Sequence, residues 1–453
     1  MTAESTSTAA LEEVRVFTAA TGVVDTTDGR SVHPDPWWAV DGSGRVVDTG
    51  HGERPARWDG ALVRDLGRSL VVPGMINAHS HAFQRAIRGR THRRGAHDPS
   101  SFWSWRTQMY TAANALTPAR IYEDTRACYR EMLAAGITCV GEFHYVHHQP
   151  DGRPYDDPNE LSMQVIAAAR DVGIKLVLLE VLYLASGIGE PPLPEQRRFC
   201  DGDVDAYLAR CDALRPHLGG GVRLGLAPHS VRAVPARALA AVADYAAHHD
   251  LVVHAHVSEQ VAENEACRAA LGRSPVAVFH EAGLCDRPRT FTAVHAIHVD
   301  DADRTMLASQ HVCACPTTEA DLGDGTILAG ALRRAGVTVA LGSDSNSIID
   351  LVTEARSLEL HERLATQRRL CVAHGDERPA GVLLDAATVG GGSALGDAAL
   401  GRLGVGDSFD AVVFDRGHRA LADVDDAHLL DALMLAGSAA PVREVFIDGS
   451  ERL

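Results

Sequence analysis

Residues 71–84 read VVPGMINAHSHAFQ and carry the strongest structural signal in the chain. An apolar run ends there in two histidines, His79 and His81, with one residue between them. Side chains of an extended segment alternate between its two sides, so both imidazoles point to the same side. Neutral imidazole is the commonest protein ligand for zinc-like cations. The segment therefore predicts a strand that ends at a metal site, although the pair alone is weak evidence in a chain with 23 histidines.

Similar apolar runs recur along the chain, separated by helix-like stretches of alanine, leucine, arginine and glutamate. Their apolar character is continuous rather than alternating, which is typical of parallel strands covered by helices on both faces. Eight such runs are the number that a (β/α)₈ barrel requires. We expect the strands at residues 70–77, 137–143, 175–182, 222–227, 251–255, 291–294, 312–315 and 337–341.

The two ends of the chain differ from this repeating part. Residues 14–65 are rich in Gly, Asp and Val with turn signals, and residues 400–453 contain SFDAVVFD and VREVFIDG. Both predict short antiparallel strands, and neither end is long enough to form a stable sheet alone. We expect one small β-sandwich built from residues 1–68 and 399–453, beside a barrel formed by residues 69–398.

The composition is ordinary for a soluble globular protein. A formal net charge of −17 argues against a nucleic-acid partner, because phosphate binding needs a basic face. No apolar stretch approaches the roughly 20 residues that span a bilayer, and the first residues do not read as a signal peptide. The nine cysteines include no C-x-x-C pair, so we expect reduced thiols. These features predict a cytoplasmic protein with a small-molecule substrate and no membrane partner.

Chemistry-bearing residues gather where the predicted strands end, which is where such barrels place their active sites. Three imidazoles and one carboxylate suit a divalent metal, Zn²⁺ first, and leave room for water. Glu259, three residues after the fifth-strand histidine, is placed to carry protons, and His295 to polarise a substrate. Asp344 can also accept a proton from the water. The predicted ligands of one ion are His79, His81, His256 and Asp344, and the pattern predicts metal-assisted hydrolysis.

Other histidines compete for the same roles. His254 and His298 occur in VVHAHV and VHAIHV, and alternation puts His254 on the same side of its strand as His256. We prefer His256 because Glu259 follows it, and His295 because it ends an apolar run. A further set of alternative ligands is His144, His147 and His148 in EFHYVHH.

A single ion is expected rather than a pair of ions. Binuclear versions of such barrels commonly bridge their ions with a carboxylated lysine. The only lysine, Lys175, begins its strand and therefore lies at the wrong end for the active face. A binuclear site would need another bridging carboxylate, such as Glu180. Iron or manganese fits the same ligands as zinc.

The motifs resemble those of the amidohydrolase superfamily. Its metal-dependent deaminase branch carries P-G-x-x-N-x-H-x-H, a later H-x-x-E, a further His and a final S-D, all present in order between Pro73 and Asp344. The resemblance spans nearly the whole chain and implies a (β/α)₈ metal-dependent hydrolase. It also implies a homodimer, for which the residues themselves give no separate support.

The resemblance is closest to the group that converts N-formimino-L-glutamate to N-formyl-L-glutamate and ammonia in histidine degradation. It rests on HSHAFQRA, SFWSWR, GEFHYVHH, APHSVRAV and TTEADLGDG. The resemblance implies that Glu259 of this chain carries a proton to the departing nitrogen. Arg106 and Arg232 would bind the glutamate carboxylates, because a guanidinium binds a carboxylate bidentately. Residue by residue, the resemblance implies substrate contacts from Gln84, Arg106, Tyr145, His229 and Arg232.

The sequence leaves open the role of Arg106, the role of one basic segment, and the identity of the substrate. Arg106 would have a structural role if it only stacks beside Trp103 and Trp105. The basic run at residues 85–94 either attracts anions or is a solvated loop. The N-terminal part fits the group loosely, and GGGSALG near Gly391 lacks a basic residue often found there, so another formimino acid is an alternative substrate. A deaminase acting on an aromatic base and a catalytically silent barrel that only binds are the competing functions.

Overall fold

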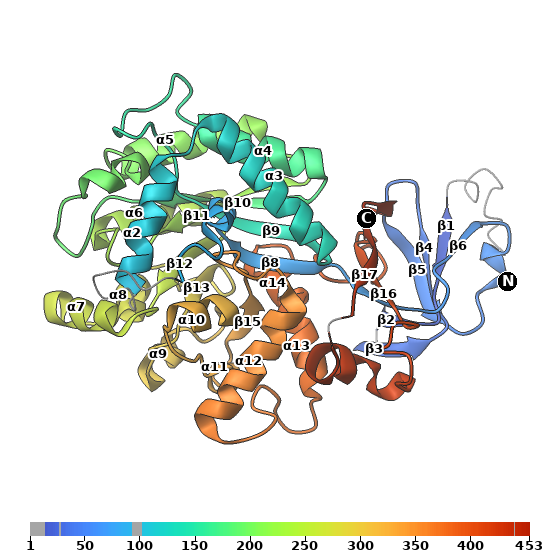
Figure 1. Ribbon diagram of the computed structural model, residues 1–453. Helices are drawn as coiled ribbons and strands as arrows, with labels where there is room; N and C mark the ends of the chain where they lie inside the picture. Colours follow the sequence, from blue (N-terminus) through green and yellow to red (C-terminus); the bar gives the residue numbers. More distant parts are fainter. Residues whose placement is uncertain (1–13, 27–28, 93–101, 439) are drawn as a thin grey trace.

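The structure is a computed structural model that describes residues 14–26, 29–92, 102–438 and 440–453. Its larger part is a barrel of parallel strands surrounded by helices, and its smaller part combines both ends of the chain (Figure 1). The eight barrel strands are β8 (Met75–Ser80), β9 (Ile137–His144), β10 (Lys175–Leu182), β11 (Val222–Pro228), β12 (Val253–Val257), β13 (Phe291–His295), β14 (His311–Ala314) and β15 (Thr338–Leu341).

Helices connect successive barrel strands and cover the outside of the barrel (Figure 1). The α-helices are α2 (Phe102–Asn114), α3 (Pro118–Ala134), α4 (Glu160–Val172), α5 (Val204–Leu214), α6 (Ala236–His249), α7 (Val261–Leu271), α8 (Pro275–Glu281), α9 (Asp301–Met306), α10 (Pro316–Leu322), α11 (Ala329–Arg334), α12 (Leu351–Thr366), α13 (Pro379–Ala387), α14 (Val389–Ala394) and α15 (Leu429–Asp431). Shorter helical turns are η1 (Ala56–Trp58), η2 (Ala82–Ile87), η3 (Pro194–Phe199), η4 (Arg215–His217), η5 (Asp426–His428) and η6 (Ala432–Ala436).

The barrel closes where the first and last strands meet. Neighbouring strands pair in parallel in chain order from β8 to β15. A bridge between Ser80 and Asp344 joins the ends of the series. The His81 amide donates to the Asp344 carbonyl at 2.9 Å, and the Asp344 amide donates to the His79 carbonyl at 3.0 Å. The predicted (β/α)₈ barrel is confirmed, and its closure lies at the histidine pair.

The first predicted strand is wrong in one respect, because residues 70–77 belong to two strands. β7 (Ser69–Pro73) pairs with strands of the smaller part, and β8 starts only at Met75. Gly74 makes the junction, where an added Cβ would lie 2.2 Å from the Thr138 Oγ1 atom. Only glycine therefore allows the chain to pass from one sheet into the other so close to β9. This pairing favours a domain boundary after Pro73 rather than after residue 68.

The predicted β-sandwich from both termini is also confirmed. One sheet has the order β5-β4-β1-β6, and the other has the order β18-β17-β16-β7-β2-β3. Contrary to the expectation of antiparallel strands throughout, β1 pairs with β6 and β2 with β7 in parallel. The remaining bounds are β1 (Arg15–Thr18), β2 (Thr21–Thr26), β3 (Gly29–Pro34), β4 (Pro36–Val40), β5 (Val46–His51), β6 (Leu62–Asp65), β16 (Ala411–Asp415), β17 (Val442–Ile447) and β18 (Ser450–Glu451).

Both ends of the chain supply the core of this sandwich. Phe17 of β1 stacks on Phe409 with ring centroids 4.2 Å apart, and Phe446 of β17 meets Phe17 edge-on at 5.2 Å. Trp38, from β4, is fully buried in the same cluster. Neither end alone could bury these rings, which explains why each segment looked incomplete in the sequence.

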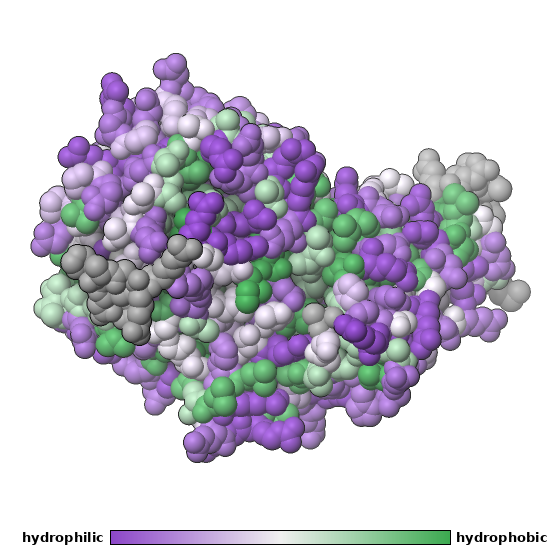
Figure 2. All heavy atoms as spheres, viewed as in Figure 1, coloured by the Kyte–Doolittle hydropathy of each residue, from purple (hydrophilic) through white to green (hydrophobic). Residues whose placement is uncertain are grey.

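The sandwich is joined to the N-terminal end of the barrel by an ion pair. Lys175 Nζ, at the start of β10, lies 2.7 Å from Asp410 Oδ2 and 2.8 Å from Asp448 Oδ1. The only lysine of the chain is thus structural and lies away from the strand ends where the predicted ligands gather. Hydrophilic residues cover much of the visible face of both parts (Figure 2). Among the described helices, none is long and apolar enough to cross a membrane.

Candidate metal centre and active site

Four buried side chains converge at the C-terminal end of the barrel. His79 lies at the end of β8 and His81 directly follows that strand. His256 belongs to β12, and Asp344 follows β15. One ligand atom of each residue lies within 4.8 Å of the ligand atoms of the other three. The Nε2 atoms of His79 and His81 lie 3.4 and 3.3 Å from Asp344 Oδ1. The structure therefore brings together the whole predicted ligand set.

The surroundings of these imidazoles fit a divalent cation. His81 Nδ1 lies 2.9 Å from the Phe143 carbonyl oxygen, and His256 Nδ1 lies 3.1 Å from the His229 carbonyl oxygen. Because a carbonyl only accepts, each Nδ1 carries the hydrogen and each Nε2 keeps its lone pair for a ligand bond. Within the described part of the chain, the two buried ring nitrogens of His79 have no hydrogen-bond partner. A bound cation would satisfy such a nitrogen.

The electrostatics of the group also suit a cation. Burial lowers the pKa of His79 to about 3, and burial lowers the pKa values of His81 and His256, so the three rings are neutral at physiological pH. Burial alone would raise the pKa of Asp344, but its close contact with His79 and the other nearby imidazoles hold that pKa below its usual range. Neutral imidazoles beside an ionised carboxylate are the protonation states in which these groups bind metal.

The backbone at the end of β15 is shaped to present Asp344. Gly342 packs so closely on β8 that an added Cβ would lie 2.8 Å from the His79 Cβ. Asp344 itself has a φ of +44°, in the left-handed region that non-glycine residues rarely adopt. His295 also has a positive φ, of +70°. Strained backbone at strand ends is typical of functional sites, where surrounding structure holds a side chain in place.

Glu259 and His295 face each other beside the ligand group. Glu259 Oε1 lies 3.9 Å from His295 Nε2, and the same nitrogen lies 3.9 Å from Asp344 Oδ2. His295 Nδ1 lies 3.2 Å from Glu319 Oε1. Burial would lower the pKa of His295, but the Glu319 hydrogen bond and the carboxylates of Glu259 and Asp344 raise it to about 10. A proton donor thus stands between the predicted proton carrier and the ligand carboxylate.

Arg232 is held by two carboxylates in this structure. Its Nη2 atom lies 3.2 Å from Glu259 Oε2, and its Nε atom lies 3.6 Å from Glu263 Oε1. Glu263, in α7, is buried, and its other oxygen accepts the Glu259 amide hydrogen at 3.1 Å. One glutamate therefore fixes both the backbone of Glu259 and the direction of the Arg232 side chain.

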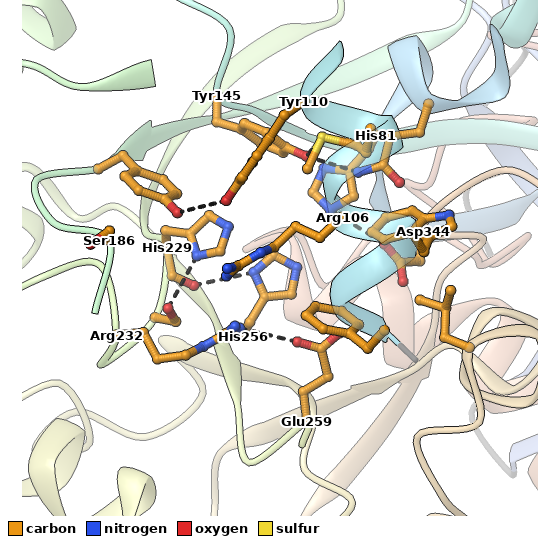
Figure 3. Close-up of a pocket in the computed structure, with 17 residues that line it drawn as sticks. His81, Arg106, Tyr110, Tyr145, Ser186, His229, Arg232, His256, Glu259 and Asp344 are labelled. Carbon is orange, nitrogen blue, oxygen red and sulfur yellow. Dashed lines mark hydrogen bonds and ion pairs between the residues drawn. The ribbon is translucent and has the colours of Figure 1, made fainter. Parts of the chain in front are cut away.

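A pocket lies over the ligand group (Figure 3). His81, His256, Asp344 and Glu259 form part of its wall. All five predicted substrate contacts line it as well: Gln84, Arg106, Tyr145, His229 and Arg232. Gln84 Nε2 donates to the Tyr145 hydroxyl at 2.8 Å, which leaves the buried Gln84 Oε1 without a described partner. The pocket therefore offers both charged and neutral hydrogen-bonding groups next to the ligand set.

Arg106 reaches this pocket from α2 and is half-buried. Its guanidinium carbon lies 5.6 Å from the centre of the Tyr110 ring. The side chain of Trp103, invoked in the stacking alternative, lies outside the described residues, whereas Trp105 lines the same pocket as Arg106. Arg106 thus packs on an aromatic ring and also faces the site.

The competing histidines lie apart from the ligand group. His254 Nε2 is 2.8 Å from the Ala394 carbonyl, and His298 Nε2 is 2.9 Å from the Asp324 carbonyl. His147 Nε2 is 2.9 Å from the Val181 carbonyl, and His148 Nε2 is 3.5 Å from Asp201 Oδ1. None of these, nor His144, belongs to a potential metal group among the residues that the structure describes.

Glu180 does not bridge the site either. It accepts hydrogen bonds from Ser162 and Arg210 in a buried network outside the pocket. A second potential ligand group consists of His295, Cys315 and Asp344, and it shares Asp344 with the first. In the basic run, Arg85 and Arg88 both pair with Glu131, each at 2.7 Å, while Arg93 and Arg94 lie outside the described residues.

Some residues of the site were not expected from the sequence. Glu319, in α10, belongs to the stretch TTEADLGDG that carries the family resemblance, but its role had not been assigned. Tyr110, Tyr183 and Ser186 line the pocket without any motif that marks them. The sequence signal for Glu263 was its position four residues after Glu259, about one helical turn away.

Comparisons with known proteins agree with this geometry. A model of the amidohydrolase family matches residues 70–452. Formimidoylglutamate deiminase from Pseudomonas aeruginosa is 42% identical over 384 residues, which cover 84% of this chain and 83% of that protein. A 5-methylthioadenosine/S-adenosylhomocysteine deaminase from Syntrophobacter fumaroxidans is 29% identical over 436 residues, 94% of this chain and 90% of that protein.

Solved structures show the same architecture. The crystal structure of an amidohydrolase from Brucella melitensis has a TM-score of 0.86 and 34% identity, and the match covers 96% of this chain and 94% of that one. An adenosine deaminase from Xanthomonas campestris with bound zinc has a TM-score of 0.80 at 24% identity, covers 96% and 92% of the two chains, and supports the fold alone. The match over residues 70–452, with these relatives, shows that the chain belongs to the amidohydrolase family and is a hydrolase.

Proposed function

We propose that the protein hydrolyses N-formimino-L-glutamate to N-formyl-L-glutamate and ammonia, a reaction of histidine degradation. The observation that carries the proposal is the pocket in which all five predicted substrate contacts stand beside the ligand group and Glu259. The similarity to formimidoylglutamate deiminase from Pseudomonas aeruginosa, at 42% identity, supports the same reaction.

The charges of the pocket match the proposed substrate. Glutamate presents two carboxylates, and a planar guanidinium binds a carboxylate through two parallel hydrogen bonds. Arg106 and Arg232 both line the pocket and are our proposed carboxylate anchors. Burial and the charge of Arg232 lower the pKa of His229, so that residue is a neutral hydrogen-bonding partner for a carboxylate or for the formimino nitrogen. Gln84 and Tyr145 would add neutral hydrogen bonds.

The proposed cofactor is one divalent ion, Zn²⁺ in the first place, held by His79, His81, His256 and Asp344. An ion held there would lower the pKa of water and so supply a nucleophile at neutral pH. Iron or manganese would suit the same ligands. The potential group of His295, Cys315 and Asp344 shares one ligand with the first, and a single ion remains the prediction.

Glu259 is the proposed proton carrier. Hydrolysis adds water across the formimino carbon–nitrogen double bond and then breaks the bond to the terminal nitrogen, which leaves as ammonia. Glu259 would accept a proton from the water and deliver it to that nitrogen. His295, protonated and near both Glu259 and Asp344, would donate a hydrogen bond where negative charge develops. Asp344 would share the first proton transfer.

Substrate binding would change the partners of Arg232. In this structure Arg232 contacts Glu259 at 3.2 Å. A substrate carboxylate would compete for the same guanidinium edge, while Glu263 continues to hold its Nε side. Docking of the substrate would thereby free a Glu259 oxygen for proton transfer. Because the proposed carboxylate anchor Arg232 and the proposed proton carrier Glu259 are neighbours, substrate binding would be coupled to proton transfer.

The experiment that tests the proposal is ammonia release from N-formimino-L-glutamate by purified protein, with metal content measured on the same sample. Rapid release with about one metal ion per chain is expected. N-formimino-L-aspartate and 5′-methylthioadenosine serve as comparison substrates for the two alternative activities. Release from either of these but not from the glutamate compound would overturn the substrate assignment, and a metal-free, inactive protein would favour the silent barrel. The homodimer and the cytoplasmic location stay predictions.

A further inference from the structure

Two tyrosines on the pocket wall share one buried glutamine. Gln196, in η3, donates through Nε2 to the Tyr110 hydroxyl at 2.9 Å and to the Tyr183 hydroxyl at 3.0 Å. Tyr110 belongs to α2, Tyr183 follows β10, and both line the pocket. Gln196 is fully buried and is not among the residues lining the pocket. Among the described residues of the pocket, Gln196 donates its hydrogen bonds to these two hydroxyls.

The direction of these hydrogen bonds follows from one backbone contact. Gln196 Oε1 accepts the Leu193 amide hydrogen at 2.8 Å. Because an amide N–H only donates, the atom facing Leu193 must be the oxygen, and the atom facing the tyrosines must be the NH₂ group. The two hydrogens of that NH₂ group serve the two hydroxyls, one each. Both phenol oxygens therefore act as acceptors toward Gln196.

Each phenol still has its own hydrogen to donate. The two hydroxyl oxygens lie 3.4 Å apart, so one hydrogen can point from one tyrosine to the other. In the part of the chain that the structure describes, neither hydroxyl has a further hydrogen-bonding partner beyond these. At least one hydroxyl hydrogen is thus left for a ligand in the pocket. Figure 3 shows the Tyr110 side chain among those that line this pocket.

The tyrosine pair lies in a positively charged part of the pocket. Arg106 packs 5.6 Å from the Tyr110 ring centre. Burial raises the pKa of the Tyr183 hydroxyl, and the charges of Arg232 and Arg106 act on the same hydroxyl in the opposite direction. A ligand group here would meet two guanidinium ions and a phenol donor together. A carboxylate would use all three groups, because its oxygens accept hydrogen bonds and its negative charge pairs with the guanidinium ions.

We propose that the Tyr110–Tyr183 pair, oriented by Gln196, donates a hydrogen bond to a carboxylate of the substrate and sets the preference for acidic substrates. Gln196 is the positioning residue of this subsite, and the two tyrosines are specificity-determining contacts. The proposal rests on the proposed function for the identity of the substrate. It assigns part of the carboxylate recognition to neutral donors that no motif marks.

The turn that carries Gln196 is itself firmly held. Arg198, fully buried, donates to the carbonyls of Ala113 and Leu116 at 2.5 and 3.2 Å, just where α2 ends. It also donates to the His148 carbonyl at 3.1 Å. η3 is therefore tied to α2 and to the segment after β9. A substitution at Gln196 that keeps the size of the side chain should therefore change the direction of its hydrogen bonds with the two tyrosines without moving η3.

Gln196→Glu is the most direct test. A carboxylate at this position would accept both phenol hydrogens and turn the donors away from the pocket. We expect the KM for N-formimino-L-glutamate to rise about 10- to 100-fold with kcat changed less than about threefold, as for loss of a hydrogen bond to a charged group. Gln108→Glu, at an exposed position of α2, adds the same charge and should leave both constants unchanged.

A substrate without carboxylates separates this role from a structural one. N-propylformamidine carries the reacting group alone, and its kcat/KM should be the same in wild type, Gln196→Glu, Tyr110→Phe and Tyr183→Phe. Equal losses on both substrates would show a structural role and overturn the proposal. The phenylalanine variants keep the rings, so the test does not depend on whether Gln196→Glu folds.

Binding of glutarate, measured by calorimetry on metal-loaded protein, needs no turnover. If N-formimino-L-glutamate is not hydrolysed but glutarate binds and weakens about 10-fold or more in these variants, the proposed function fails and the carboxylate subsite stands. Unchanged glutarate affinity together with an unchanged KM in Gln196→Glu and Tyr183→Phe would overturn the subsite.

Discussion

Replacing Glu259 by glutamine tests the proposed chemistry most directly. Glutamine has nearly the same size, and its Oε1 atom can still accept from Arg232, which lies 3.2 Å from the present carboxylate. The substitution therefore removes the ability to carry a proton but preserves the packing of the pocket. Because Glu259 is not one of the four predicted ligands, the metal should be retained at about one ion per chain.

The size of the effect follows from the two proton transfers assigned to this residue. A positioned acid or base contributes about 10² to 10⁴ in rate. Glu259 serves both the attack of water and the departure of ammonia, so we expect kcat to fall by about 10⁴, or about 5.4 kcal/mol of activation free energy. KM should change by less than about threefold, because the carboxylate anchors remain.

The assay is steady-state ammonia release with metal content determined on the same sample. Glu265→Gln is the matched control, since Glu265 is an exposed residue of α7, the helix that begins just after Glu259, and should retain full activity. A Glu259→Gln enzyme that holds its metal and keeps more than about a tenth of the wild-type kcat would refute the proton-carrier assignment. A variant that has lost its metal would instead place Glu259 among the groups that hold the ion.

Three further substitutions test the ligand set, the anchor and the domain contact. His79→Ala should lower the metal content to near zero by atomic absorption, and a metal-replete variant would count against the ligand group. Arg232→Ala should raise KM about 100-fold with a smaller fall in kcat, and an unchanged KM would remove Arg232 from the carboxylate anchors. Lys175→Met leaves the buried Asp410 unpaired and should lower the free energy of unfolding by about 3 kcal/mol, seen as a lower urea midpoint. Arg153 is exposed, so Arg153→Met should shift that midpoint little. If Lys175→Met shifted the midpoint no more than Arg153→Met does, the Lys175 ion pair would not be stabilising.

The barrel could be predicted because its evidence is local and repeats along the chain. Each buried parallel strand needs its own continuous apolar run, so eight runs imply eight strands. The division of residues 70–77 into β7 and β8 was missed for the same reason. Both strands are apolar, and only the pairing of β7 with β16 and β2 shows which sheet it joins. Local pattern does not specify a long-range partner.

The predicted ligands were readable because their order along the chain maps onto the order of strands around the barrel. His254 and His256 lie on one strand and cannot be told apart by alternation. They differ in their contacts, because His254 meets the Ala394 carbonyl and His256 belongs to the ligand group. The contacts of Arg232 with Glu259 and Glu263 could not be predicted from the sequence, because they join the turn after β11 to residues more than 25 positions away, just before and inside α7.

The fold class, the hydrolase family and the residue types that could hold a cation were all readable from the amino-acid sequence, because short motifs at strand ends carry that information. The arrangement of neutral donors and carboxylates around those residues exists only in the folded chain. Tyr110, Tyr183 and Gln196 come from three separate segments and share hydrogen bonds only when the barrel and its covering helices are assembled. Hydrogen bonds depend on distance and direction in space, and neither is encoded by spacing along the chain.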